Sequence, residues 1–267
     1  MKARFLLSLA AGGFALGACS DAPTNTTEVP QHPDFILYGT PDENDHPYVG
    51  ALLFYNASGP AWFCTGTALD ANTILTAGHC TSGATEAHWY QTEKPLDEFS
   101  TIEDFFAGGI VGTPITYPAF GASFPNTGDI GVVQLVSGTA SGPYAQLAEP
   151  NALADLSKHH VFELVGYGNQ DVRPVEVFTL ERFQARAKLV NATSGYSGGY
   201  NLHLSSNNGV PHRGGLCFGD SGGPVLSGDV VYGVNSFVKN SNCAGSGFSY
   251  RVDIEPVHTW IVEQLEN

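Results

Sequence analysis

The chain has 267 residues, of which 42% are hydrophobic and 14% are charged, with 32 glycines and 16 prolines. Such a composition can bury a large core and supplies many turns, which excludes an intrinsically disordered chain. The net charge of −15 opposes binding to nucleic acid and to anionic membranes, so we expect neither as a partner.

The N-terminus has the parts of a secretory signal peptide. Lys2 and Arg4 form a short basic head, and Phe5–Leu16 is an apolar run too short to span a bilayer. The run leads into Leu-Gly-Ala-Cys, ending at Cys19, which resembles a bacterial lipobox, where the cysteine thiol receives a lipid. We expect residues 1–19 to direct export to an extracellular or periplasmic compartment. The alternative is an ordinary signal peptide cut just before an incidental cysteine.

The remaining chain divides into a linker and a region of short strands. Residues 20–35 are polar, rich in Pro and Thr and without periodicity, which indicates a linker or pro-segment. From residue 36 onward, runs of five to seven apolar residues recur between clusters of turn residues, as strands do. The clearest are Val49–Tyr55, Thr73–Ala77, Ile130–Val136, Val161–Tyr167 and Val230–Val234.

Helical spacing appears only near the C-terminus. Val257, Trp260 and Ile261 fall on one face of a helix predicted over residues 254–266, and Asp253 could cap it. Many short strands with one terminal helix predict an all-β protein, a barrel or a sandwich.

Ser221 lies in a glycine-rich turn, Gly-Asp-Ser-Gly-Gly-Pro. Glycines allow backbone conformations barred to other residues and leave room for a substrate. In such a turn the N–H groups of Gly219 and Ser221 can converge on one point and stabilise an oxyanion. A serine hydroxyl becomes a good nucleophile only beside a base, and the base needs an acid that holds its tautomer.

His79 and Asp129 are the candidates for that base and that acid. His79 lies in Leu-Thr-Ala-Gly-His-Cys, and Asp129 begins an apolar strand in Thr-Gly-Asp-Ile-Gly-Val-Val. Asp97 and Asp104 lie nearby but lack a following apolar strand. Each of these residues alone would be read as an ordinary core, turn or loop residue, whereas the set indicates nucleophilic hydrolysis.

These three segments resemble those of the chymotrypsin/trypsin family, which carries TAGHC, an Asp-Ile strand and GDSGGP in this chain order. The resemblance covers nearly all of residues 36–267. It implies two six-stranded antiparallel Greek-key barrels, over about 36–145 and 146–250, with a C-terminal α-helix. The implied activity is that of a serine endopeptidase with His79, Asp129 and Ser221 as its triad, acting on proteins or peptides as a monomer without metal or cofactor.

The same resemblance gives roles to four of the five cysteines, since Cys19 is assigned to the lipid. A Cys64–Cys80 bridge would brace the base, and a Cys217–Cys243 bridge would brace the pocket walls. From the sequence alone, the other pairings of these four cysteines stay possible.

The resemblance also implies activation by proteolysis. In the family a new N-terminal amine pairs with the aspartate that precedes the nucleophile, here Asp220. Ile36-Leu37-Tyr38-Gly39 resembles the usual start of the mature chain, and an activating protease is therefore an expected partner. Phe35 precedes the cut, so we do not expect a trypsin-like activator. Because no cysteine would tether residues 19–35, cleavage would release an outer-membrane lipoprotein from its anchor.

The specificity pocket is inferred in the same way. Gly215 occupies the floor, where trypsin-like enzymes carry Asp, so a preference for Lys or Arg is not expected. Ser236, Phe237 and Val238 form one wall, with Val238 narrowing the slot, and Gly247 leaves the opposite wall open. We expect cleavage after neutral residues of small to medium size.

Three alternatives were weighed. A catalytically silent binding or adhesion protein could share this fold, although it would have no need of an intact triad. The Gly-x-Ser-x-Gly pattern also matches the nucleophile elbow of α/β-hydrolases, but too little chain follows Ser221 to supply that fold's acid and histidine. A metalloenzyme is not favoured, since His159, His160 and His203 lack metal-ligand spacing.

Overall fold

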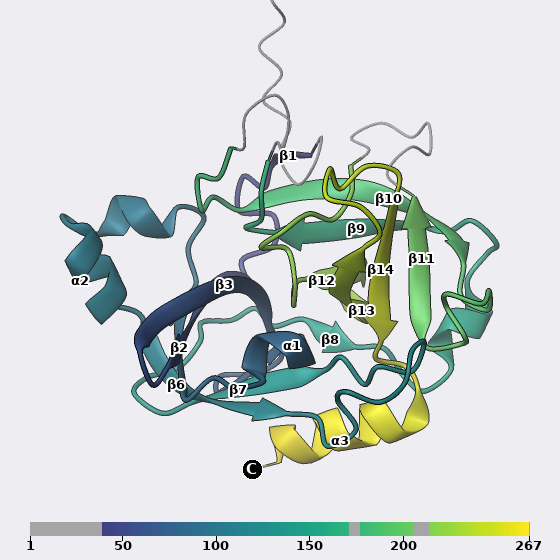
Figure 1. Ribbon diagram of the computed structural model, residues 1–267, viewed down its shortest axis with the longest axis horizontal. Helices are drawn as coiled ribbons and strands as arrows, with labels where there is room; N and C mark the ends of the chain where they lie inside the picture. Colours follow the sequence, from purple (N-terminus) through teal and green to yellow (C-terminus); the bar gives the residue numbers. More distant parts are fainter. Residues whose placement is uncertain (1–38, 171–176, 206–213, 267) are drawn as a thin grey trace, which may run out of the picture. The chain divides into compact units, whose positions relative to one another are not determined.

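The computed structural model describes residues 39–170, 177–205 and 214–266. The expected lipidation site at Cys19 and the expected activation site at Ile36 lie outside the described residues. The described chain forms two closed β-barrels, drawn from purple to teal and from green to yellow in Figure 1.

The first barrel closes in the strand order β2-β3-β4-β7-β6-β5, and every neighbouring pair is antiparallel. Gly50 in this barrel faces the ring of Trp89, and a Cβ there would lie 2.5 Å from the Trp89 Cη2 atom, so only glycine fits. The strands are β2 (Val49–Asn56), β3 (Gly59–Ala68), β4 (Thr73–Thr76), β5 (Glu86–Tyr90), β6 (Ile110–Thr116) and β7 (Gly131–Leu135).

The second barrel closes in the order β9-β10-β11-β14-β13-β12, because β9 pairs with both β10 and β12. Its core is a cluster of large apolar side chains that includes Phe162, Leu164, Phe183 and Leu202. The strands are β9 (Val161–Gly166), β10 (Phe183–Asn191), β11 (Asn201–Ser205), β12 (Pro224–Ser227), β13 (Val230–Val238) and β14 (Ser246–Arg251).

Short elements complete the fold. Two short strands lie outside the barrel rings, β1 (Thr40–Pro41) pairing with β10 and β8 (Gln146–Leu147) pairing in parallel with β13. The helices are α1 (Gly78–Thr81), α2 (Ile102–Ala107) and α3 (Glu255–Leu265), with 3₁₀ turns η1 (Pro95–Glu98) and η2 (Ala152–Asp155). None of the described helices has the length and apolar character needed to cross a bilayer.

The prediction of two six-stranded antiparallel barrels followed by a C-terminal helix is confirmed. The five predicted strands correspond to β2, β4, β7, β9 and β13. Within the segment of about 36–145 expected to form the first barrel, Thr40 and Pro41 pair with Gln184 and Phe183 of the second barrel.

The C-terminal helix packs on the rest of the protein through the face that the sequence predicted to be buried. Val257 and Ile261 are buried, and the Trp260 ring meets Tyr117 edge-on at 5.2 Å between centroids. Asp253 does not cap the helix, whose N-cap residue is Ile254.

Asp253 is instead held by groups outside the helix. Its carboxylate accepts two hydrogen bonds of 2.8 Å from the Arg251 guanidinium and one of 2.9 Å from the Leu153 N–H. These three donors hold the carboxylate toward Arg251 and Leu153, and no side chain caps the first turn of the helix.

A buried cluster of charges fastens the start of the described chain to the second barrel. Arg182 is 1% exposed, and its Nε donates to Asp42 Oδ2 at 2.7 Å. A second nitrogen of the guanidinium donates to the Asn44 side chain. His46 Nδ1 lies 2.5 Å from the other Asp42 oxygen. Burial opposes protonation of His46, but hydrogen bonds to Asp42 and Glu163 outweigh it and raise its pKa to about 9.

Replacing Arg182 by Leu should lower the free energy of unfolding by about 3 kcal/mol, because it removes one member of a fully buried ion pair and leaves His46 as the remaining counter-charge of Asp42. Equilibrium unfolding in urea measures the change. Lys94→Ala is the matched control: it breaks the 2.7 Å pair with Glu181 at the surface, which should cost less than about 1 kcal/mol. Equal effects of the two substitutions would contradict a special role for the buried pair.

Candidate active site

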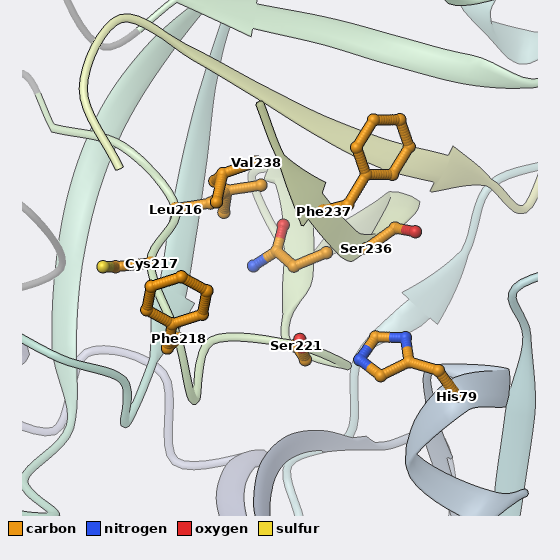
Figure 2. A pocket seen from close by; sticks show the side chains of 9 residues that line it. His79, Leu216, Cys217, Phe218, Ser221, Ser236, Phe237 and Val238 are labelled. Carbon is orange, nitrogen blue, oxygen red and sulfur yellow. The ribbon is translucent and has the colours of Figure 1, made fainter. Parts of the chain in front are cut away.

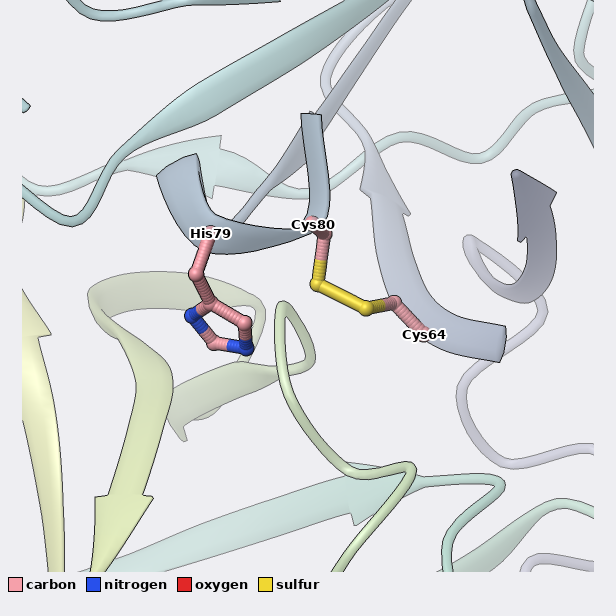
Figure 3. Close-up of side chains that lie close together, drawn as sticks. All are labelled: Cys64, His79 and Cys80. Carbon is pink, nitrogen blue, oxygen red and sulfur yellow. A yellow bond between two sulfur atoms is a disulfide. The ribbon is translucent and has the colours of Figure 1, made fainter. Parts of the chain in front are cut away.

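His79 lies on α1, a single helical turn that follows β4. The turn packs closely on the first barrel, since a Cβ on Gly78 would lie 2.9 Å from the carbonyl oxygen of Ile130. The Cys64–Cys80 disulfide ties α1 to β3, with the imidazole beside it (Figure 3). His79 is therefore presented on a braced turn, with 39% of its side chain exposed.

Asp129 lies two residues before the start of β7 and is 4% exposed. Its carboxylate accepts a hydrogen bond from the His79 main-chain N–H at 2.8 Å and lies 2.9 Å from His79 Nδ1. The Ser236 hydroxyl also donates to it. Burial alone would raise the pKa of Asp129, but the hydrogen bonds from His79 and Ser236 and the attraction of His79 hold it below its ordinary value. The carboxylate is thus ionised and aligned with the ring.

Ser221 lies in a turn packed between the two barrels. Its carbonyl accepts from the N–H of Thr65 in the first barrel, and the next residue, Gly222, donates to the carbonyl of Asn235 in the second. Gly222 has φ of +86°, and a Cβ there would lie 2.3 Å from the Thr65 carbonyl oxygen. The glycine predicted to permit this turn is therefore required both by its backbone angle and by lack of space.

His79 and Ser221 line the same cavity, and the imidazole faces the Ser221 side chain (Figure 2). No hydrogen bond joins the two side chains among the described residues. Within that part of the chain, the N–H groups of Gly219 and Ser221 also donate to no other group. Hydrogen bonds between catalytic groups often tighten only when substrate is bound.

The cavity beside Ser221 has a volume of about 240 Å³ and lies between β13 and the segment that leads to Ser221 (Figure 2). Its walls are mostly apolar, and the Cys217–Cys243 disulfide braces one of them. The lining residues are His79, Leu216, Cys217, Phe218, Ser221, Asn235, Ser236, Phe237 and Val238.

Two predicted pocket residues, Gly215 and Gly247, do not line this cavity. A Cβ on Gly247 would lie 2.8 Å from Leu216 Cδ1, so the leucine fills the space that the sequence led us to expect open. Leu216 and Val238 lie at the end of the cavity away from His79 (Figure 2). Leu216 lines the cavity without having been predicted to do so, although it directly follows Gly215, the predicted floor residue.

A second, shallower hollow of about 390 Å³ lies on the other side of His79. Phe124, 49% exposed, meets Phe237 edge-on across it at 5.9 Å between ring centroids. Three aromatic rings line the hollow beside polar groups, and its other lining residues are His79, Phe120, Thr127, Asp129 and Ser236.

Asp220 is completely buried beneath the serine turn. Its two oxygens accept hydrogen bonds of 2.8 Å from the N–H groups of Gly168 and Cys217. No cation contacts it among the described residues, and burial raises its pKa to about 7 despite these two bonds. The backbone approaches closely, since a Cβ on Gly166 would lie 2.3 Å from Asp220 Oδ1.

Cys64, His79 and Cys80 bring three potential metal-ligand atoms within 4.8 Å of one another. The two sulfur atoms are bonded to each other in the disulfide (Figure 3), so neither is a thiolate that could bind a metal ion.

The profile of the trypsin family matches residues 38–261. The chain belongs to the trypsin family. Among curated relatives, this trypsin-family protein is 30% identical to alkaline trypsin A of Manduca sexta over 260 residues, which cover 92% of this chain and 93% of the relative. It is 26% identical to chymotrypsin-like elastase family member 1 of Macaca fascicularis, covering 82% of this chain and 85% of that protein.

Solved structures show the same fold. HL collagenase superimposes on the trypsin-family protein with a TM-score of 0.66 at 19% identity, covering 86% of this chain and 98% of the collagenase. At this level of identity the likeness establishes the architecture, and the chemistry has to be argued from the site.

Proposed function

We propose that this protein is an active serine endopeptidase that cleaves peptide bonds through an acyl-enzyme. The observation that carries the proposal is the buried, ionised Asp129 held on His79 Nδ1, with the ring facing Ser221 across one cavity. Asp129 fixes the tautomer with hydrogen on Nδ1, which leaves Nε2 free to act as the base.

The steps follow from these positions. Ser221 Oγ attacks the carbonyl carbon of the substrate while its proton passes to His79 Nε2. The N–H groups of Gly219 and Ser221 stabilise the oxyanion, since no other described group uses them. The imidazolium then gives its proton to the leaving amine. Water then gives a proton to the same ring and attacks the ester carbonyl. As the bond to Ser221 Oγ breaks, the imidazolium returns that proton to Oγ and the acid product leaves.

We propose that the enzyme cleaves after neutral residues of small to medium size. The cavity of about 240 Å³ is closed by Leu216 and narrowed by Val238, and no carboxylate lines it among the described residues. Gly215, at the position where trypsins carry Asp, has no side chain to pair with Lys or Arg. The shallow aromatic hollow beside His79 offers a place for an apolar residue on the N-terminal side of the cleaved bond.

Labelling with a fluorophosphonate and cleavage of a peptide library test the proposal together. We expect one labelled serine, Ser221, and cuts after neutral residues. Strong cleavage after Arg would overturn the specificity. Absence of both labelling and cleavage in the processed protein would instead favour a silent binding protein on the same fold.

We infer that a cut before Ile36 activates the protein. Asp220 is a buried carboxylate with main-chain donors but no described cation, and a new amine would supply the missing charge. An export signal, a disulfide-braced fold and a cut after the Cys19 segment would together yield an enzyme released from its lipid anchor into an oxidising compartment.

Protein processed to begin at Ile36 should exceed the uncut protein in kcat/KM by about 100-fold or more, because removing one member of a buried ion pair costs about 3–5 kcal/mol. In the processed protein, Asp220→Asn should abolish most of this increase in kcat/KM. N-terminal sequencing of membrane-bound and soluble fractions, beside the kinetic assay, measures both. Full activity with the segment from Cys19 to Ile36 intact would refute the idea.

A further inference from the structure

Asn235 is a buried amide in the wall of the substrate cavity. It lies on β13, is 1% exposed, and lines the 240 Å³ cavity beside Ser221. Its side-chain oxygen accepts a hydrogen bond of 3.1 Å from the Ser249 hydroxyl. Its Nδ2 nitrogen has no hydrogen-bond partner in the described part of the chain. A buried donor left unpaired is uncommon in folded proteins and calls for an explanation.

The amide has little freedom to find another partner. The Asn235 N–H donates to the Gly223 carbonyl at 2.8 Å, and its carbonyl accepts from the Gly222 N–H at 2.8 Å. The main chain is thus tied to the serine turn at both groups. The Ser249 hydroxyl holds the side-chain oxygen, which leaves Nδ2 as the unpaired end of the amide in the described part of the chain.

The other polar side chains of the cavity are already engaged in the proposed reaction. Ser236 gives its hydroxyl hydrogen to Asp129, while His79 and Ser221 are the base and the nucleophile. Leu216 and Val238 are apolar. Asn235 Nδ2 is therefore the polar group left for a side chain that enters the cavity.

We propose that Asn235 is a specificity-determining residue that donates a hydrogen bond to an oxygen in the substrate side chain preceding the cleaved bond. The inference rests on the proposed peptidase function and narrows its substrate class. Neutral side chains with an oxygen acceptor, such as Thr, Asn and Gln, are preferred over hydrocarbons of the same shape. Among the described lining residues no Lys or Arg could compensate a carboxylate, so an acidic side chain is disfavoured.

The test compares peptides that differ only at the residue preceding the cleaved bond, in shape-matched pairs: Thr against Val, Asn against Leu, and Gln against Met. For the processed wild-type enzyme, the oxygen-bearing member of at least one pair should have a kcat/KM about 10-fold higher, because the buried donor stays unpaired with the hydrocarbon. Asn235→Leu should abolish or invert this ratio while leaving fluorophosphonate labelling of Ser221 in place.

A double variant, N235L with S249A, guards against a failure to fold. It removes both members of the Asn235–Ser249 hydrogen bond, which is better tolerated than leaving Ser249 alone and unpaired. Its substrate ratio should match that of the single variant. Cleavage of the Val, Leu and Met peptides as well as or better than their oxygen-bearing partners in all three pairs, by labelled wild-type enzyme, would overturn the role of Asn235 and leave the peptidase function standing. Loss of labelling and cleavage altogether would overturn both.

Discussion

Replacing Ser221 by Ala should lower kcat about 10⁶-fold, since removal of the nucleophile from a cooperating triad eliminates nearly all of its contribution. The Ser221 hydroxyl makes no hydrogen bond to another described group, so the fold should be unaffected. The measurements are hydrolysis of a peptide substrate, fluorophosphonate labelling, and the midpoint of thermal unfolding.

Ser58→Ala is the matched control for this substitution. Ser58 lies in the turn between β2 and β3, where its main-chain N–H donates to the Asn56 side chain, so the substitution leaves that bond in place. Its activity should equal that of the wild type. Retention of labelling in the Ser221→Ala protein would mean that another residue is the nucleophile, and the proposed mechanism would be wrong.

Replacing Asp129 by Asn should lower kcat about 10⁴-fold with little change in structure. The amide that replaces the carboxylate can donate to His79 Nδ1, which then has to accept. The ring hydrogen moves to Nε2, and the nitrogen that faces Ser221 can no longer take its proton. The loss should fall on kcat more than on KM, because the substitution moves the proton on His79 while keeping the size of the side chain, which lines the shallower 390 Å³ hollow and not the 240 Å³ cavity.

Asp104→Asn serves as the comparison for Asp129, because Asp104 was weighed as an alternative acid and lies exposed on α2. It should leave kcat within a factor of about two of wild type, in keeping with the small effects of exposed surface substitutions. A large loss in Asp104→Asn combined with a small loss in Asp129→Asn would reverse the assignment of the acid.

Two buried polar side chains, Asp220 and Asn235, each lack one partner among the described residues. The Asp220 carboxylate accepts hydrogen bonds from main-chain N–H groups but has no cation beside it among the described residues. The Asn235 side-chain oxygen is paired with the Ser249 hydroxyl, whereas its Nδ2 donor has no partner in that part of the chain. One group lies beneath the serine turn and the other lines the cavity above it. Cleavage of the chain would give Asp220 an amine to pair with, and a bound substrate would give Asn235 Nδ2 an acceptor.

Local sequence patterns predicted strands and the terminal helix, whereas the two-barrel arrangement and the proposed triad came from the resemblance of three segments to the chymotrypsin/trypsin family. Strand length and turn residues are local properties, so β2, β4, β7, β9 and β13 could be read from short windows. The glycines around Ser221 are equally local, because φ angles such as the +86° of Gly222 restrict the residue type at a single position.

Only the tertiary structure decided which distant groups meet. Asp42 and Arg182 are 140 residues apart, and neither stands out in its own segment, yet together they form a buried ion pair. Leu216 fills the space over Gly247 because two segments pack side by side, and Asp253 turns from the helix to Arg251 and Leu153 for the same reason. Packing and pairing between segments depend on relative position in space, which no local pattern encodes.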